Sequence, residues 1–151
     1  MTEKKLPSLY SLTQIGIATF LGSSLAAGYM LASNYAALGQ RRMAIYSLWG
    51  SLGLVLAFIL LPGQLSTNAA IAIGIMIGQV VLVLAIANKL QGPMFASFEE
   101  MGGQYFPMWR TIVVGIGASF VLVFVWILFV SLFGGDLPQA PTPANGTAPT
   151  L

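Results

Sequence analysis

The chain has 151 residues, of which 57% are hydrophobic and 7% charged, whereas ordinary globular proteins carry about 25% charged residues. A soluble surface cannot be built from so few charges, so we predict an integral membrane protein. Cysteine and histidine are absent, which excludes disulfides, thiolate metal sites, cysteine nucleophiles and histidine proton shuttles. The net charge of +2 is too small to indicate nucleic acid as a partner. No cofactor is predicted.

Four apolar stretches follow one another, each close to the ~20 residues that a helix needs to cross a bilayer. None contains a charged residue between its ends. The pattern predicts an all-α, polytopic membrane bundle with four transmembrane helices, at residues 13–32, 44–61, 69–88 and 111–133. Residues 1–12 form a short polar head before this transmembrane domain (13–133). Residues 134–151, rich in Pro, Thr and Ala, are predicted to be a disordered tail.

The first span contains "FLGSSLAAGYMLASNYAALGQRR" (residues 20–42) and is the least hydrophobic of the four. A cleavable signal peptide is the alternative, because Lys4 and Lys5 precede an apolar core and a run of small residues near Ala26. The apolar pattern continues past that run, so we favour an anchored span. The segment from Asn34 to Gly39 is expected to end this helix.

Small residues recur at four-residue spacing on two spans, which allows a neighbouring helix to approach closely. These pairs and triplets are Gly22/Ala26, Ser24/Gly28 and Ala70/Gly74/Gly78. We expect them to bring helices together within the chain or between copies. Gln79, in the middle of span three, should face the bundle or a partner, because an unpaired amide in hydrocarbon costs several kcal/mol.

Basic residues near the span ends predict the orientation of the chain. Four of them, Arg41, Arg42, Lys89 and Arg110, follow spans one and three, whereas Lys4 and Lys5 precede span one. Four against two favours cytoplasmic loops after spans one and three, with both termini on the non-cytoplasmic side.

The loop over residues 91–110 holds the adjacent carboxylates Glu99 and Glu100, which could act as an acid and a base or bind a cation. Neighbouring residues on a helix point in different directions, so we expect instead a short amphipathic helix in the membrane interface. Its apolar residues would be Phe95, Phe98 and Met101, and Gly102–Gly103 would end it.

Aromatic and basic residues at the ends of the spans are predicted to anchor the chain in the interface. Tyr105, Phe106 and Trp109 would form an aromatic belt where span four enters the membrane. The predicted anchors are Arg41, Arg42, Lys89, Tyr105, Trp109 and Arg110.

Spans one and three end alike, each with Asn and a Gly-containing turn before a return span, about 54 residues apart. Two hairpin repeats would give this pattern. The run Leu-Gly-x-x-Leu-Ala-x-Gly-Tyr-x-Leu-x-x-Asn-Tyr-x-x-Leu-Gly (21–39), with "LQGP" (90–93), "GG" (102–103) and "WR" (109–110), resembles a family of small bacterial inner-membrane proteins of uncharacterised role. The resemblance spans residues 12–130. It implies bacterial origin and a cytoplasmic-membrane location, and it carries over no active site.

The sequence therefore predicts a non-catalytic membrane protein that acts as a packing or assembly partner, with the bilayer, other copies or another membrane protein as its partners. A small transporter or channel, working as an oligomer with Gln79 along the passage, is the first alternative. The spans carry no ionisable residue, which argues against proton-coupled or cation-coupled transport. An interfacial membrane enzyme that uses Glu99 and Glu100 is the second alternative.

Overall fold

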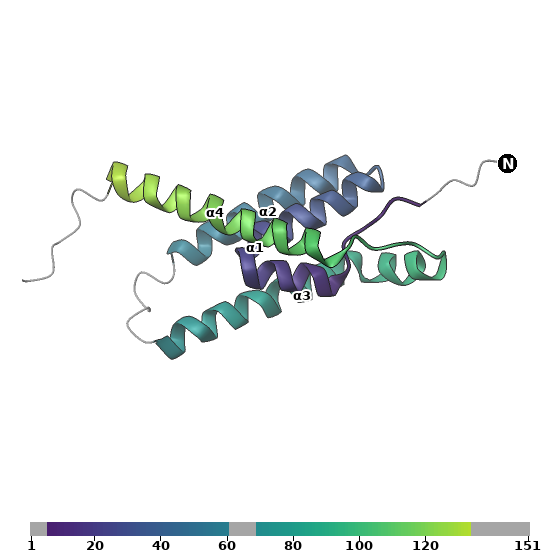
Figure 1. The fold of residues 1–151 in the computed structure, drawn as a ribbon, viewed down its shortest axis with the longest axis horizontal. Coiled ribbons are helices and arrows are strands. Elements are labelled where there is room, and N and C mark those ends of the chain that lie inside the picture. The colour runs from purple at the N-terminus through teal and green to yellow at the C-terminus, as the bar shows by residue number, and fades with distance from the viewer. Residues whose placement is uncertain (1–5, 61–68, 134–151) are drawn as a thin grey trace, which may run out of the picture.

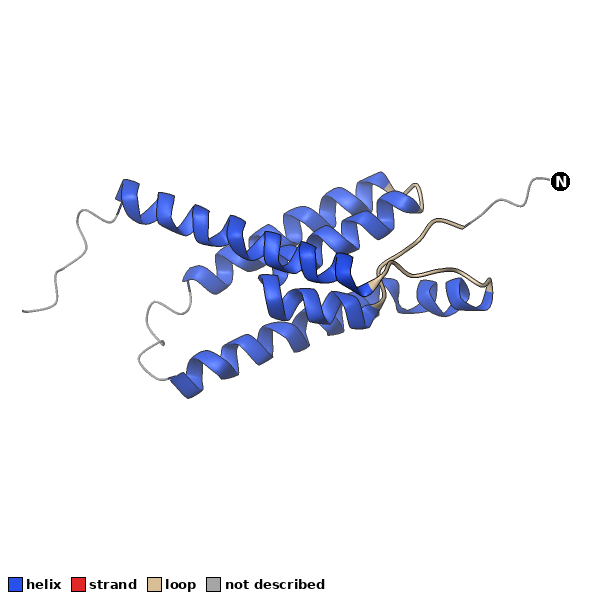
Figure 2. Cartoon of the chain, viewed as in Figure 1, coloured by secondary structure: helices blue, strands red, loops and turns tan. Residues whose placement is uncertain are grey.

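The computed structural model describes residues 6–60 and 69–133 (Figures 1 and 2). They form four helices: α1 (Leu12–Ala37), α2 (Arg41–Leu60), α3 (Ala69–Glu100) and α4 (Met108–Phe133). Over these two ranges the only extended pairing is an isolated bridge between Leu9 and Tyr105. The predicted all-α class is confirmed. The predicted tail, and residues 1–5 of the predicted head, lie outside the described residues.

Helix α1 reverses direction at Gly22 and Ser23. The backbone there is not helical, with φ −128° and ψ 17° at Gly22 and φ 64° and ψ −175° at Ser23. A straight helix would separate residues 10 and 34 by about 36 Å, yet the Tyr10 N–H donates to Asn34 Oδ1 at 2.7 Å. The halves 12–21 (α1a) and 24–37 (α1b) therefore run in opposite senses (Figure 1). We call α1 the α1 hairpin, Gly22–Ser23 its tip, and the opposite end its open end.

The α1 hairpin is the centre of the fold, because α2, α3 and α4 each pack against it and make at most sparse contacts with one another. Gly22 at the tip approaches the backbone of Gly115 in α4, and a Cβ at Gly22 would overlap the Gly115 carbonyl. A Cβ at Gly28 of α1b would overlap the Ser51 side chain of α2. Glycine at both positions therefore permits the close approach of helices that the small-residue pattern predicted.

Helix α3 lies along both halves of the hairpin and supplies part of the buried core. The Leu84 side chain lies over Gly16 of α1a, and Gln91 Nε2 donates to the Leu31 carbonyl of α1b at 3.3 Å. The main buried cluster joins α1, α3 and the segment before α1: Tyr10, Ile15, Ala18, Ala26, Ala27, Met30, Leu31, Val83, Ala87 and Phe95.

Three of the described helices, α1, α3 and α4, are long and apolar enough to cross a membrane, judged by length and composition. The halves of α1 are only about 15 and 21 Å long, whereas a hydrocarbon core is about 30 Å thick. Since α1 folds back, residues 13–32 do not form one straight helix, as a single crossing requires. Helix α2 has 20 residues, enough for about 30 Å.

The chain direction follows from this reversal. Helix α2 leads away from the open end, α3 returns to it, and α4 leads away again, so the two ends of the described chain lie at opposite ends of the molecule (Figure 1). The prediction that both termini share one side of the membrane counted α1 as a full crossing, and it stays a prediction.

Helix α3 also departs from its predicted end at residue 88. It continues through Pro93 to Glu100, so residues 94–100 are no separate interfacial helix but the last turns of α3. Gly102, at φ 72°, follows the helix, and the Gly103 N–H donates to the Phe98 carbonyl at 2.9 Å. This Schellman motif ends the helix at the predicted Gly102–Gly103.

The predicted pair of hairpin repeats is wrong. Helices α3 and α4 do not form a packed pair, because both pack on α1. Helix α3 is also continuous through Gly78 and Gln79, whereas α1 breaks in its middle.

We expect single cysteines in this cysteine-free chain to label from opposite sides of the membrane. Ser8→Cys and Ser97→Cys should react with an impermeant thiol reagent added on one side, and Ser66→Cys and Thr147→Cys with the reagent on the other. Three crossings after a folded-back α1 require this result. Labelling of Ser8→Cys and Thr147→Cys from the same side would support four full crossings instead.

Candidate functional site

The tip of the α1 hairpin holds the one non-glycine residue with a positive φ in the described backbone. Ser23 has φ 64° and ψ −175°, a region that is almost reserved for glycine and costs a serine about 1–3 kcal/mol. Its hydroxyl accepts a hydrogen bond from the Leu25 N–H at 3.3 Å and so caps α1b. Such a conformation persists only where the surrounding contacts impose it.

Polar side chains of α3 and α4 supply those contacts. Gln79 Nε2 donates to Ser24 Oγ at 3.2 Å. The Ser119 hydroxyl donates to the Leu21 carbonyl, which the break in the helix leaves without its usual partner. Gln79 and Ser119 each lie about 15–17 Å along their helices, which is half the thickness of a hydrocarbon core. Uncharged polar groups from three helices thus meet about half-way along the apolar lengths of α3 and α4.

A cavity of about 330 Å³, the tip cavity, lies beyond the tip. Ser23 and Gln79 are its polar lining residues. Its apolar walls come from the parts of α2 and α4 that lead away from the open end: Val55, Phe58, Leu122, Val123 and Trp126. This lining offers hydrogen bonds without charge, so it suits a small uncharged polar or amphipathic molecule and contains no acid or base.

A second polar cluster closes the open end of the hairpin, around Asn34 and Gln91, which are both fully buried. The Asn34 amide accepts from the Tyr10 N–H and donates to the Tyr10 carbonyl at 2.9 Å. Asn34 Nδ2 also donates to Gln91 Oε1 at 3.1 Å. This network joins the segment before α1 to α1b and α3.

The segment Leu9–Ser11, which we call the N-terminal strap, runs beside the loop between α3 and α4 (Figure 2). The Phe106 N–H donates to the Leu9 carbonyl at 2.9 Å, and Gln14 Nε2 donates to the Phe106 carbonyl at 2.6 Å. Leu9 and Tyr10 are fully buried, so the prediction of a polar head over residues 1–12 is wrong for this segment.

Sequence reasoning missed Gln14 and Gln91, and it treated Asn34 only as the start of the segment 34–39 that ends the helix, where α1 does end, at Ala37. Each of the three lies within a predominantly apolar helix, where a buried amide must find a partner. That requirement was the available signal. It identifies the amides but not their partners, which lie 24 to 92 residues away.

The small-residue stripes have different surroundings. Ala26 is buried in the core. Gly22 faces α4 and Gly28 faces α2. The Ser24 hydroxyl accepts a hydrogen bond from the Gln79 amide. On α3, Ala70 is exposed, and a Cβ at Gly74 or Gly78 would meet nothing within 4 Å. This α3 stripe therefore does not bring helices together within the chain.

The predicted interfacial anchors divide into two groups. Arg41, Arg42, Lys89 and Trp109 are exposed. Tyr105 turns inward, with its ring 5.6 Å from that of Phe98, and the Arg110 guanidinium lies 4.1 Å from the centre of the Phe106 ring.

Glu99 and Glu100 are exposed, and Glu99 Oε1 accepts a hydrogen bond from the Tyr105 hydroxyl at 2.9 Å. Burial raises the pKa of Tyr105 to about 12, and the neighbouring Glu99 carboxylate adds to the shift. The Tyr105 phenol therefore stays neutral at physiological pH. Within the described residues, no group of three or more acidic side chains could hold a metal ion, and nothing in this geometry favours the interfacial-enzyme alternative.

Comparison of the chain with protein-family models, with curated proteins and with solved structures finds no match. The resemblance of residues 21–39 to a family of small inner-membrane proteins therefore stays a prediction.

We expect Asn34→Leu to lower the free energy of unfolding by about 2–4 kcal/mol, because it leaves the Tyr10 peptide and Gln91 without their buried partner. Thermal unfolding in detergent measures the loss. Asn88→Leu, at an exposed position of α3, is the matched control and should unfold close to the wild-type temperature. Equal stabilities of the two variants would show that the amide pairing does not hold the hairpin.

Proposed function

We propose that the chain is a non-catalytic protein of a bacterial inner membrane and acts as an assembly partner, with a second copy or another membrane protein against α3 and α4. In the most apolar 18-residue stretch of α3 and of α4, 6% of the residues are buried within the chain, compared with 67% in α1. Lipid can cover apolar side chains, but Gly74 and Gly78 on α3 leave an open face that also suits a closely packed helix. The open face at Gly74 and Gly78 is the observation that carries this proposal.

The distribution of basic residues supports an orientation with the N-terminus in the cytoplasm and the C-terminus outside. Arg41 and Arg42 begin α2 at the open end, and Lys89 and Arg110 lie near the same end. The four basic residues of the described chain thus gather at one end, and this asymmetry is the usual mark of the cytoplasmic side.

We expect Gly78→Leu to weaken association of the purified protein roughly tenfold, because a large side chain keeps the partner helix at a distance. Gly53→Leu on α2 is the matched control, since a Cβ there also meets nothing within 4 Å. Cross-linking in native membranes and sizing in gentle detergent measure the effect. A wild-type protein that is monomeric in both, with no stoichiometric partner in a pull-down, would contradict the proposal.

A passage for small uncharged solutes is a second candidate function, favoured by the tip. The hydrogen bond between Gln79 and Ser24 lies at mid-membrane depth. Ser23 and Gln79 line the tip cavity on one side, whereas Ser24 lines a groove that leads toward the open end. A solute without charge could exchange hydrogen bonds at this pair without meeting an ionisable group.

If the second candidate holds, proteoliposomes that contain the protein should swell faster in glycerol or urea than empty vesicles. Gln79→Leu should remove most of that difference, because the mid-membrane amide is lost while the chain keeps its apolar contacts. Gln104→Leu, in the exposed loop after α3, should retain it. Equal permeability of vesicles with and without protein would exclude the passage.

A further inference from the structure

A groove of about 250 Å³ runs between α2 and α3, with α1b as its floor. It exists because α2 and α3 both pack on α1 and not closely on each other. Ala27, Gly28 and Leu31 form the floor. Met43 and Leu54 of α2 and Val83, Ile86 and Leu90 of α3 form much of the walls.

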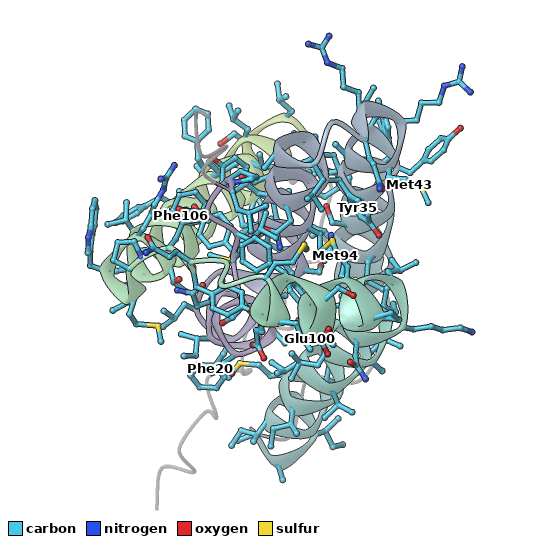
Figure 3. The ribbon with its side chains drawn as sticks, turned by 90° about the vertical axis from the view of Figure 1, so that its right-hand side faces the viewer. Phe20, Tyr35, Met43, Met94, Glu100 and Phe106 are labelled. Atoms are coloured by element: carbon cyan, nitrogen blue, oxygen red, sulfur yellow. The ribbon has the colours of Figure 1, made fainter. Side chains whose placement is uncertain are left out.

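The groove begins at the open end and stops at the tip. Tyr35, Met43 and Leu90 line its outer part, and Ser24 lines its inner part. Figure 3 views the molecule from the open end and shows Tyr35 and Met43 near one another. From Tyr35 to Ser24 the floor is about 16 Å long, which is half of a hydrocarbon core and therefore the depth of one lipid leaflet.

The outer end of the groove is positively charged. Arg41 and Arg42 directly precede the lining residue Met43, Lys89 directly precedes the lining residue Leu90, and all three basic side chains are exposed. The carboxylates at the end of α3 lie ten or more residues beyond Lys89, about 15 Å along the helix. An anion at this mouth meets three basic residues, whose long side chains can reach the headgroup level.

We propose that this groove binds an anionic phospholipid of the leaflet at the open end, with one acyl chain along α1b and the phosphate near Arg41, Arg42 and Lys89. The three exposed basic residues at the mouth and the one-leaflet depth of the groove favour a lipid with a phosphate headgroup over an apolar helix of a second copy as the occupant. The proposal does not depend on assembly through α3.

Gly50→Phe tests the acyl-chain site. Gly50 lines the groove, and a Cβ there meets nothing within 4 Å, so the ring has room to occupy the groove without displacing a helix. Gly53→Phe, at an equally open position of α2 outside the groove lining, is the control. Phospholipid that remains after gentle detergent extraction and washing is measured by native mass spectrometry. We expect the wild type and Gly53→Phe to retain an anionic phospholipid. Gly50→Phe should retain at least fivefold less of it.

The charge of the mouth is tested by competition between phosphatidylglycerol and phosphatidylcholine with identical acyl chains. Neutralising Arg41, Arg42 and Lys89 to Gln should lower the preference for phosphatidylglycerol by about fivefold per charge. Arg110→Gln, whose side chain lies on the Phe106 ring instead, should change it little.

Three results would overturn the proposal. They are a washed wild-type protein free of lipid, equal retention of the two lipids, and efficient cross-linking between copies through Gly50→Cys. Thermal unfolding of each variant shows whether the fold is intact. If Gly50→Phe does not fold, the charge variants decide, because their substitutions lie on exposed side chains.

Discussion

The pairing of the Asn34 amide with the Tyr10 peptide holds the two ends of α1 together, and the rest of the arrangement depends on it. A side-chain amide offers one donor and one acceptor in the geometry of a peptide group, so Asn34 completes the Tyr10 backbone as a neighbouring strand would. In an apolar surrounding this exchange is strongly favoured over leaving either group unpaired. It fixes the place where α1 returns, and hence the end from which α2 starts.

The reversal of α1 also explains why polar residues occur in the middle of α3 and α4. An interrupted helix at membrane depth exposes backbone groups that hydrocarbon cannot satisfy, so the break must be enclosed by protein with polar partners. Gln79 and Ser119 lie at that depth and bond to Ser24 and to the Leu21 carbonyl. Seen in one helix, each looks like an isolated polar residue. Together they form the surrounding that a broken helix requires.

Hydropathy predicted α2, α3 and α4 from the sequence because each is a long helix with a continuous apolar pattern. It did not predict the reversal in α1, since Gly22, Ser23 and Ser24 are compatible with a weakly hydrophobic straight helix and no proline marks the break. The bonds that fold α1 back join residues far apart in the chain, and a local pattern does not contain them. The glycines at helix crossings were predictable as small residues, but which helix each one meets was not.

The path of α1 and the distribution of charge agree with each other, although they come from different physics. The hydrogen bonds of Asn34 return the chain to its starting end, and the four basic residues of the described chain lie near that same end. A charge asymmetry of this kind guides insertion into the membrane. Agreement between independent constraints is what a sequence that specifies one fold should show. The folded-back α1 therefore accounts for the buried polar groups and agrees with the distribution of the described basic residues.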